Sequence, residues 1–345
     1  MAEYKRKLAS IQLIEEIRPH DNSDNLELAI VLGWQVVIKK NEFKKGDKII
    51  YFEIDSICPD RPWSEFLKSR GFRIRTIKLR NKISQGLILP INIDANINLN
   101  EQKIGDDVTD LIGVTKYESP EDKQCNIQGN LRVSTFPTHF GFMKTDEPRL
   151  QSHLKYLDLF KGRAWYATNK YDGTSGTFFI DPQTKELAVC SRNQRIEKPV
   201  DIKESKNNYW LVAEKYQLET LLSKIDHLVI QAEVYGPGIQ GNKLNVKELM
   251  LGIFSIYDLN KKTYCLYREI VDYCQQMGLN MVRVDSEGDN FNFTLDELLE
   301  KARGKYSNSK YDREGLVFRL KDSNEIEGER ASFKVINNDF LVNEK

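Results

Sequence analysis

The sequence lacks the patterns that mark structural zinc sites, disulfide frameworks and membrane spans. Its five cysteines include no CxxC pair, and its four histidines form no paired ligand motif. This spacing argues against a zinc site and against a disulfide-stapled fold. No apolar run approaches the roughly 20 residues that a membrane span needs, and the first ten residues lack the apolar core of a signal peptide. We therefore expect an intracellular protein with no membrane partner, with cytoplasm and nucleus both open.

The chain also lacks an excess of either charge. Lys and Arg together number 51, as do Asp and Glu, so the formal net charge is zero. A nucleic-acid partner is still compatible with this balance, because recognition needs a local basic face and not a basic protein. Hydrophobic residues at 40% and charged residues at 30% indicate a globular chain, and 345 residues suit two domains.

The first hundred residues predict a small β domain. Short β-rich runs are separated by turn signals such as Gly33 and Lys45-Gly46-Asp47. The expected strands are 8–17, 26–31, 34–38, 48–54, 73–79 and 86–90. Strands of this number and spacing favour an OB-like barrel, a nucleic-acid-binding fold. We assign residues 1–100 to it and residues 101–131, which are polar and weakly periodic, to a linker.

Residues 132–345 predict an α+β catalytic domain with antiparallel sheets and flanking helices. Its expected strands are 165–171, 177–180, 187–191, 228–234, 251–257 and 315–320. Its expected helices are 207–225, 268–277 and 294–302. The strands do not alternate with helices as in βαβ repeats, so a simple parallel sheet is not expected.

The chemistry is concentrated in an ordered series of short motifs. The first is Asn169-Lys170-Tyr171-Asp172-Gly173, at the end of an expected strand. This KxDG pattern alone is weak, since average composition yields it by chance in about one chain in ten. Five further motifs follow in order: Ser191-Arg192-Asn193, Gln231-Ala232-Glu233, Phe254-Ser255-Ile256-Tyr257-Asp258, Arg313-Glu314-Gly315 and Ser332-Phe333-Lys334.

Together these six motifs resemble those of the covalent nucleotidyltransferases, which comprise DNA ligases, RNA ligases and mRNA capping enzymes. The N-terminal stretch and Lys144-Thr145-Asp146-Glu147-Pro148-Arg149 are similar to one RNA ligase clade, that of the Deinococcus and Naegleria enzymes. Those ligases place an OB domain before the catalytic domain. The same order follows here from the strand pattern, and the resemblance covers nearly the whole chain.

The resemblance implies an ATP-dependent RNA ligase with Lys170 as nucleophile, and leaves RNA repair, editing and nick sealing open as its role. Lys170 would form lysyl-AMP, AMP would pass to an RNA 5′-phosphate, and a 3′-hydroxyl would displace it, with nicked duplexes as the expected substrate. The implied catalytic residues are Lys170, Glu233, Glu314 and Lys334. The implied ligands of Mg²⁺ or Mn²⁺ are Asp172, Glu233 and Glu314. We expect a monomer.

The remaining expectations concern nucleotide and RNA binding. The implied nucleotide-binding residues are Arg149, Asn169, Lys170, Arg192, Glu233, Lys334 and Tyr257, with Phe254 as the alternative stacking ring. Many ligases carry Lys-x-Lys in the last motif, whereas Val335 and Ile336 follow Lys334 here. Arg149 is therefore our candidate for the missing phosphate contact. Burial, Lys334, Arg149 and a metal are expected to lower the pKa of Lys170.

Basic side chains of the OB-like domain are either an RNA platform or ordinary solvated surface. They are Lys39, Lys40, Arg73, Arg75, Lys78, Arg80 and Lys82, of which Arg73 and Arg75 would share a strand face. Two rival functions stay open at this point. One is a DNA ligase or capping-type guanylyltransferase, separable by ATP against GTP labelling. The other is a non-catalytic RNA-binding OB protein, which the presence of all four implied catalytic residues disfavours.

Overall fold

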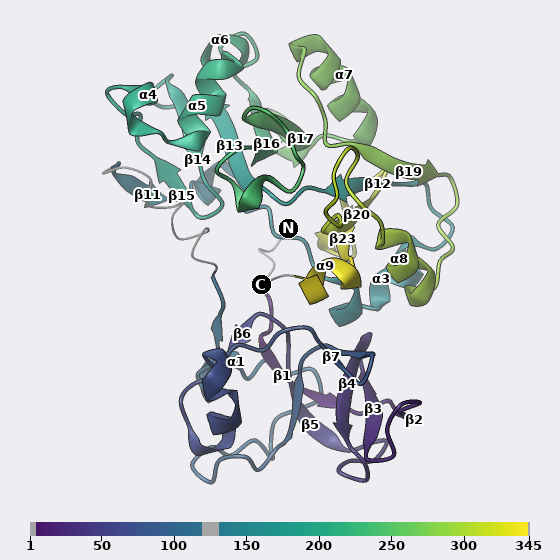
Figure 1. Ribbon diagram of the computed structural model, residues 1–345. Helices are drawn as coiled ribbons and strands as arrows, with labels where there is room; N and C mark the ends of the chain where they lie inside the picture. The colour runs from purple at the N-terminus through teal and green to yellow at the C-terminus, as the bar shows by residue number, and fades with distance from the viewer. Residues whose placement is uncertain (1–4, 119–130, 344–345) are drawn as a thin grey trace. The chain divides into compact units, whose positions relative to one another are not determined.

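The computed structural model describes residues 5–118 and 131–343, which fall into two compact units (Figure 1). Of the described residues, the smaller unit contains 5–118, 149–155 and 341–343. The larger unit contains residues 131–148 and 156–340. Within these described ranges, no helix has the length and apolar character needed to cross a membrane.

The smaller unit consists of short antiparallel strands. One sheet has the order β1-β5-β9, another the order β2-β3-β4, and two further pairs are β7-β8 and β6-β10. Their bounds are β1 Ala9–Leu13, β2 Glu16–Pro19, β3 Leu26–Val31, β4 Trp34–Lys39, β5 Lys48–Phe52, β6 Ser56–Ile57, β7 Ile77–Leu79, β8 Lys82–Ser84, β9 Leu87–Pro90 and β10 Thr115–Lys116. Its short helical segments include η1 Pro62–Arg70, α1 Thr109–Ile112 and η3 Leu150–Ser152.

The predictions of two strands in this unit are wrong in part. The run 8–17 forms two strands, because the backbone N–H of Ile14 bonds to Asp47 while that of Glu15 bonds to Ile30, which passes the chain from one sheet to another. In the run 73–79 only β7 forms. Arg73 is instead buried, with its guanidinium 2.9 Å from a carboxylate oxygen of Asp55 and 3.5 Å from the centre of the Tyr117 ring.

The expected linker is also wrong for its described part up to residue 118. Val108, Ile112 and Val114 of that stretch are buried, and together with Leu99, which precedes it, they belong to the same hydrophobic core as the strands of the smaller unit. The polar composition of residues 92–118 hid these four apolar positions, which are spaced too irregularly to show a period. Residues 119–130, the rest of that prediction, lie outside the described residues.

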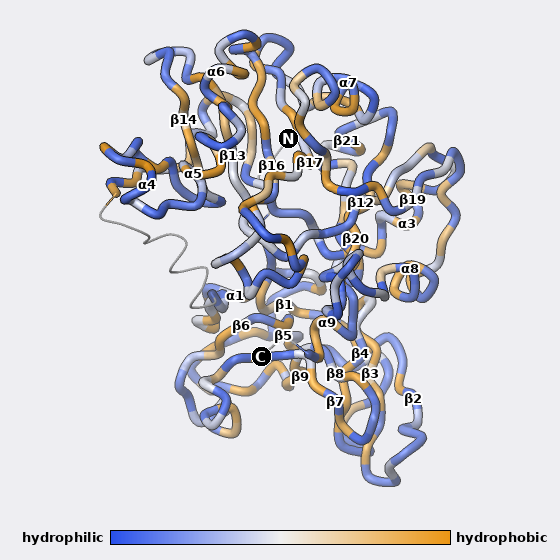
Figure 2. The backbone as a smooth tube through the Cα atoms, turned by 45° about the horizontal axis from the view of Figure 1, so that its top comes forward, coloured by the Kyte–Doolittle hydropathy of each residue, from blue (hydrophilic) through white to orange (hydrophobic). Residues whose placement is uncertain are grey.

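The larger unit contains a seven-stranded antiparallel sheet in the order β11-β15-β14-β13-β16-β17-β18. Its strands are β11 Val133–Thr135, β13 Thr174–Ile180, β14 Leu187–Cys190, β15 Gln194–Ile196, β16 Leu228–Tyr235, β17 Met250–Asp258 and β18 Thr263–Tyr264. The central strands β13, β16 and β17 carry hydrophobic residues, shown in orange in Figure 2, whereas most connecting turns are hydrophilic.

The two faces of this sheet have different coverings. One face, with Phe178, Ile230 and Ile253, packs against helical residues such as Trp210 and Cys274 to form the largest core. The helices are α4 Ile202–Ser205, α5 Asn208–Lys215, α6 Leu218–Leu222 and α7 Tyr267–Met277. The other face packs Phe179, Val229 and Tyr257 against Phe136 and Phe142.

The expected single helix 207–225 is interrupted. The Asn207 side chain accepts hydrogen bonds from the backbone N–H groups of Tyr209 and Trp210, and so caps the start of α5. Gln217 then takes a left-handed conformation with φ of 49°, which an α-helix of L-residues does not continue through. The expected helix is therefore α5 followed by α6.

A second sheet of four strands, in the order β19-β12-β20-β23, packs its apolar face onto an aromatic cluster. The bounds are β12 Trp165–Lys170, β19 Val284–Gly288, β20 Gly315–Leu320 and β23 Ser332–Ile336. Phe318 and Phe333 stack with centroids 5.3 Å apart, and Trp165 lies 5.6 Å from Phe318. The remaining elements of the unit are η2 Thr138–Phe140, α3 Lys155–Phe160, η4 Gln240–Asn242, α8 Leu295–Ala302, and the hairpin β21 Glu325–Ile326 and β22 Glu329–Arg330. The division between the units falls within α9 Asn338–Asn343, after Phe340.

Candidate active site

The KxDG motif lies where the chain passes from the four-stranded sheet to the seven-stranded sheet. Lys170 ends β12, and Thr174 begins β13. The step is tight at Gly173, where a Cβ atom would lie 2.5 Å from the carbonyl oxygen of Val234 and 2.9 Å from Cγ of Glu233. Only glycine fits such a contact, so Gly173 brings β16 and its carboxylate close to the end of β12.

Lys170 forms an ion pair at this junction. Its Nζ lies 2.7 Å from a carboxylate oxygen of Glu314, which directly precedes β20. Burial lowers the pKa of Lys170, but the negative charges of Glu314, Glu233 and Asp172 outweigh burial and raise it above its usual value. The lowering expected from burial is therefore outweighed by the three acidic neighbours, and the part of the expectation that rests on a bound metal stays a prediction.

The other two carboxyl groups are held in a partly desolvated, acidic environment. Burial raises the pKa of Glu233 to about 8, with Glu314 and Asp172 adding to the rise and Lys170 opposing it. Burial and then Glu314 raise the pKa of Asp172 to about 7, although its ion pair with Lys243 opposes the shift. The site thus has surplus negative charge, which a cation would relieve.

This donor set fits a divalent cation held partly by water and phosphate. Within residues 5–118 and 131–343, no three Asp, Glu, His or Cys side chains converge into a preformed metal cage. Asp172 is bonded to Lys243 and Glu314 to Lys170 instead. Mg²⁺ commonly binds through one or two carboxylates together with waters and substrate phosphates, and Asp172, Glu233 and Glu314 are the residues that would supply them.

The raised pKa values predict a pH-dependent metal requirement. A carboxylic acid below its pKa is neutral and a poor ligand, so the Mg²⁺ concentration for half-maximal lysyl-AMP formation should fall as pH rises from about 6 to about 9. Metal titrations at fixed pH values measure this. Deprotonation of Lys170 changes the rate at saturating metal, whereas deprotonation of the carboxyl groups changes the metal concentration needed for half-maximal rate. The two effects can therefore be measured separately. Glu233→Gln should weaken the dependence, and a half-maximal concentration independent of pH would contradict the prediction.

Lys334 shares a sheet face with Lys170. Thr168 on β12 pairs with Val317 on β20, which pairs with Lys334 on β23. Side chains opposite each other on neighbouring strands point to the same face, and Lys170 is two residues from Thr168. Lys334 therefore lies on the face of the nucleophile, as its predicted role requires. Asn169 points to the opposite face. There its side-chain oxygen Oδ1 accepts a hydrogen bond from the Arg313 guanidinium at 3.2 Å.

Arg313 ties this region to a helix end. Its guanidinium donates to the carbonyl oxygens of Lys301 and Arg303, at the C-terminus of α8, and forms an ion pair with Asp285 on β19. The bond from Arg313 to Asn169 therefore links the residue before Glu314 to the residue before Lys170.

The predicted nucleotide-binding residues on or next to the seven-stranded sheet differ in burial: Arg192 and Phe254 are partly exposed, whereas Tyr257 is buried. Arg192 follows β14 and forms an ion pair with Asp146. Tyr257 is buried beneath Phe142, with ring centroids 6.1 Å apart. Phe254 is half-buried, because it is the extra residue of a β-bulge between β16 and β17. The stacking ring therefore stays a prediction, with both residues as candidates.

Arg149 belongs to the smaller unit. Its guanidinium lies 2.9 Å from Asp55 and 3.8 Å from Glu53. With Arg6 and Arg73 nearby, the positive charges hold the pKa of Asp55 well below its usual range even though burial opposes them. The predicted phosphate contact of Arg149 stays a prediction.

Two residues of the site were not anticipated from the sequence. Lys243, which pairs with Asp172, lies in the irregular segment after the Gly236-Pro237-Gly238 turn. Tyr306, whose hydroxyl bonds to the backbone of Lys170, lies between α8 and β20. The position of Lys243 shortly after a strand-borne motif was a usable signal, whereas nothing in the local sequence distinguishes Tyr306 from a core tyrosine.

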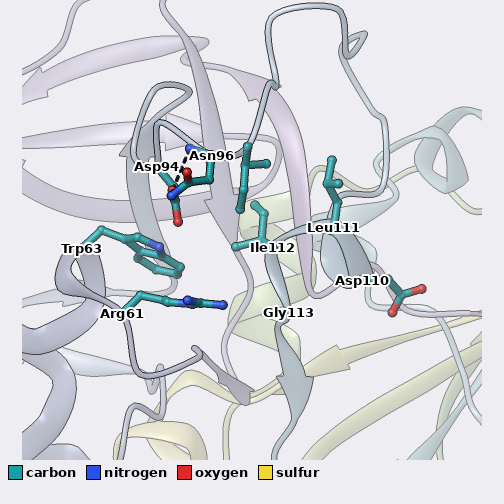
Figure 3. Close-up of a pocket in the computed structure, with 9 residues that line it drawn as sticks. Arg61, Trp63, Asp94, Asn96, Asp110, Leu111, Ile112 and Gly113 are labelled. Carbon is teal, nitrogen blue, oxygen red and sulfur yellow. Dashed lines mark hydrogen bonds between the residues drawn. The ribbon is translucent and has the colours of Figure 1, made fainter.

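A separate hollow of about 350 Å³ lies in the smaller unit. Figure 3 shows Trp63 and Arg61 on one side of it, with Asp94 and Asn96 nearby and Leu111 on the helix opposite. The amide of Asn96 donates to the Asp94 carboxylate at 3.1 Å. None of the predicted site residues lines this hollow.

The class of protein follows from the two units and the lysine site: an OB fold joined to a nucleotidyltransferase domain. The OB-fold domain model matches residues 8–91, and the RNA ligase family model matches residues 163–336. This chain belongs to the RNA ligase family. The predicted fold class, family and ATP-dependent RNA ligase activity are thereby confirmed over the DNA ligase, capping and non-catalytic alternatives.

Solved structures of Naegleria gruberi RNA ligase are similar over nearly the whole length. The structure with PPi is 33% identical, covers 98% of each chain and has a TM-score of 0.85. A mutant with ATP and Mn is 32% identical, covers 97% of this chain and 98% of its own, and has a TM-score of 0.85. A mutant with AMP and Mn is 33% identical with the same coverage and TM-score. These complexes agree with the predicted cofactors. The comparison with curated proteins gave no match.

Proposed function

We propose that this RNA ligase joins 3′-hydroxyl and 5′-phosphate RNA ends, at nicks in duplexes, through lysyl-AMP and adenylylated RNA. The observation that carries the proposal is the position of Lys170, at the junction of two sheets and 2.7 Å from Glu314, with Glu233 and Asp172 close enough to shift its pKa. An amine surrounded by carboxylates is suited to a reaction in which a cation and a nucleotide enter together.

In the first step, Nζ of Lys170 attacks the α-phosphorus of ATP. The new bond joins nitrogen to phosphorus, the bond to pyrophosphate breaks, and the ammonium proton must leave. Glu314 is the nearest acceptor for that proton. A divalent cation, Mg²⁺ or Mn²⁺, would supply charge neutralisation for the phosphates when bound. Lys334, on the same sheet face as Lys170, would bind phosphate oxygens.

The nucleotide would lie against the face of the seven-stranded sheet that carries Glu233. Glu233, Gln231 and Val229 alternate on that face of β16, which runs from a polar end beside Gly173 to an apolar end under Phe179 and Tyr257. The polar end suits ribose and phosphates, whereas the apolar end is packed against Phe136 and Phe142. We propose Tyr257 as the stacking ring and Phe254 as the alternative. Arg192 would contact phosphate.

In the second step the RNA 5′-phosphate oxygen attacks lysyl-AMP, and Lys170 is released as the amine. In the third, the 3′-hydroxyl oxygen attacks the 5′-phosphorus of adenylylated RNA, forming the phosphodiester and releasing AMP. Each transfer depends mainly on positioning and charge neutralisation.

One assay tests the sequence of steps. Protein labelled with ³²P from α-labelled ATP should lose its label to RNA carrying a 5′-phosphate beside a 3′-hydroxyl at a nick, and sealed RNA should follow. A matched nick without the 5′-phosphate should leave the protein labelled. Equal sealing of unpaired strands would show that the nick is not required, and label from GTP in place of ATP would contradict the nucleotide assignment.

The exposed basic residues of the β7-β8 hairpin are proposed to bind RNA. Lys78 and Arg80 are exposed, whereas Arg73 is buried against Asp55 and Lys82 pairs with Asp21. The double substitution Lys78→Gln and Arg80→Asn should leave lysyl-AMP formation unchanged and weaken sealing at limiting RNA. Asparagine tolerates the φ of 48° at position 80.

The measurement is the apparent RNA affinity at several salt concentrations. Each lost duplex phosphate contact should reduce the slope of log affinity against log salt by roughly 0.9. A control with Lys203→Gln and Lys224→Gln removes two exposed positive charges from the larger unit and should keep the wild-type slope. An unchanged slope in the hairpin variant would show that the hairpin does not contact RNA.

A further inference from the structure

A single buried hydroxyl group contacts the backbone of three residues of the proposed active site. Tyr306 is 5% exposed. Its hydroxyl donates to the carbonyl oxygen of Lys170 at 2.8 Å. It accepts from the backbone N–H of Asp172 at 3.0 Å and from that of Glu314 at 3.1 Å. A phenol is both donor and acceptor, so all three contacts have compatible polarity.

These contacts lie where the strand pairing ends. β12 ends at Lys170 and β20 begins at Gly315, and these two residues are the last pair of the ladder. Asp172 and Glu314 lie just beyond it, so pairing between β12 and β20 does not reach them. On its β23 side, Glu314 is held by its carbonyl oxygen, which accepts from the backbone N–H of Asn337 at 2.9 Å. At this point the Tyr306 hydroxyl bridges the segment that follows β12 and the residue that precedes β20. It therefore sets the spacing between the backbone that carries Lys170 and the backbone that carries Glu314.

The ring and the hydroxyl have separable roles. The Tyr306 ring contacts the Tyr171 ring edge to face, with centroids 6.3 Å apart, and phenylalanine retains such packing. The hydroxyl alone makes the three backbone contacts. A buried polar group is costly unless its hydrogen bonds are made, so an apolar ring would serve packing better. The three backbone hydrogen bonds therefore explain why a tyrosine and not a phenylalanine occupies this position.

We propose that Tyr306 is a positioning residue for lysyl-AMP formation, whose hydroxyl fixes Lys170, Asp172 and Glu314 relative to one another without contacting substrate. This inference rests on the proposed roles of those three residues. It predicts that loss of the hydroxyl slows the first step. The fraction of protein that can be labelled and the affinity for ATP should stay unchanged.

The test is Tyr306→Phe in the full-length chain, with single-turnover lysyl-AMP formation from labelled ATP and Mg²⁺. The rate constant at saturating ATP should fall roughly 10- to 100-fold, the size of effect expected from misplaced reacting groups. The end-point labelling and the half-saturating ATP concentration should stay near wild type. Tyr311→Phe is the matched control, because it removes an exposed hydroxyl from the same segment, and it should react like wild type.

Amide hydrogen exchange supplies a readout that does not depend on activity. In Tyr306→Phe, exchange should increase at Asp172 and Glu314, which lose their acceptor, and stay unchanged within β23. Increased exchange throughout β12, β20 and β23, or a reduced end point with an unchanged rate, would overturn the inference in favour of a general structural role. Wild-type kinetics in the variant would also overturn it. A wild-type protein that takes no label would refute the proposed function, and this inference with it.

Discussion

We expect Lys170→Met to abolish covalent AMP transfer and all RNA sealing that starts from ATP. Methionine keeps most of the length and apolar character of the lysine stem but offers no nitrogen to attack phosphorus. In the wild-type protein Nζ of Lys170 forms the ion pair with Glu314, and the charges of Glu233 and Asp172 also act on it. The assay is denaturing electrophoresis after incubation with α-labelled ATP and Mg²⁺.

Two controls make this result specific. Lys224→Met removes an exposed lysine from the same unit and should label normally. Lys170→Met should still seal RNA that is supplied already adenylylated, since the third step does not use the lysine as a nucleophile. Covalent label on the Lys170→Met protein would show that Lys170 is not the nucleophile.

Glu314→Ala and Glu233→Ala should each slow lysyl-AMP formation by roughly 100- to 1000-fold, the range seen when a positioned charge-stabilising group is lost. Both groups are partly buried beside Lys170. Neither is part of a hydrophobic core, so the folded state should persist, as thermal unfolding would show. Asp289→Ala, an exposed carboxylate at the end of β19, should react at the wild-type rate. A near wild-type rate in either glutamate variant would contradict its role.

The glutamine variants add a pH signature. Glu314 is the strongest of the charges that raise the pKa of Lys170, followed by Glu233. Glu314→Gln removes that charge, so the pKa of Lys170 should fall and more of the amine should be neutral at a given pH. The rising limb of residual rate against pH should therefore move to lower pH, and further in Glu314→Gln than in Glu233→Gln. A shift to higher pH would show that Glu314 does not stabilise the ammonium form.

Much of the site was predictable because its residues lie at the ends of strongly patterned strands. β12, β16 and β20 were expected within one or two residues of their observed bounds, and Lys170, Glu233 and Glu314 are positioned by them. The resemblance of the six motifs to those of the nucleotidyltransferases implied which carboxylates meet the lysine, and the charges of Glu314, Glu233 and Asp172 do act on Lys170. It did not predict the sign of the lysine pKa shift, because that sign depends on how close three acidic groups come in space.

The errors have a common physical origin in long-range contacts. The alternation in Arg73-Ile74-Arg75-Thr76 is typical of a half-buried strand, yet the buried ion pair of Arg73 with Asp55 diverts the chain. The four buried apolar residues between 99 and 114 are too far apart in sequence to show a period, although they converge in the core. Tyr306 is recognisable only once β12 and β20 are placed side by side.

The double linkage around the nucleophile restricts how the site can change during a reaction cycle. Arg313 bonds to Asn169 beside the ion pair, and Tyr306 bridges the backbone of Lys170 and Glu314 on the other side. Strand separation at this point would break both linkages together. In the proposed first step the amine would therefore move from Glu314 to phosphorus by rotation about its own methylene chain, with the backbone as a fixed anchor. The flexible reach of a lysine side chain, and not a movement of the sheet, would then be the moving part of the first chemical step.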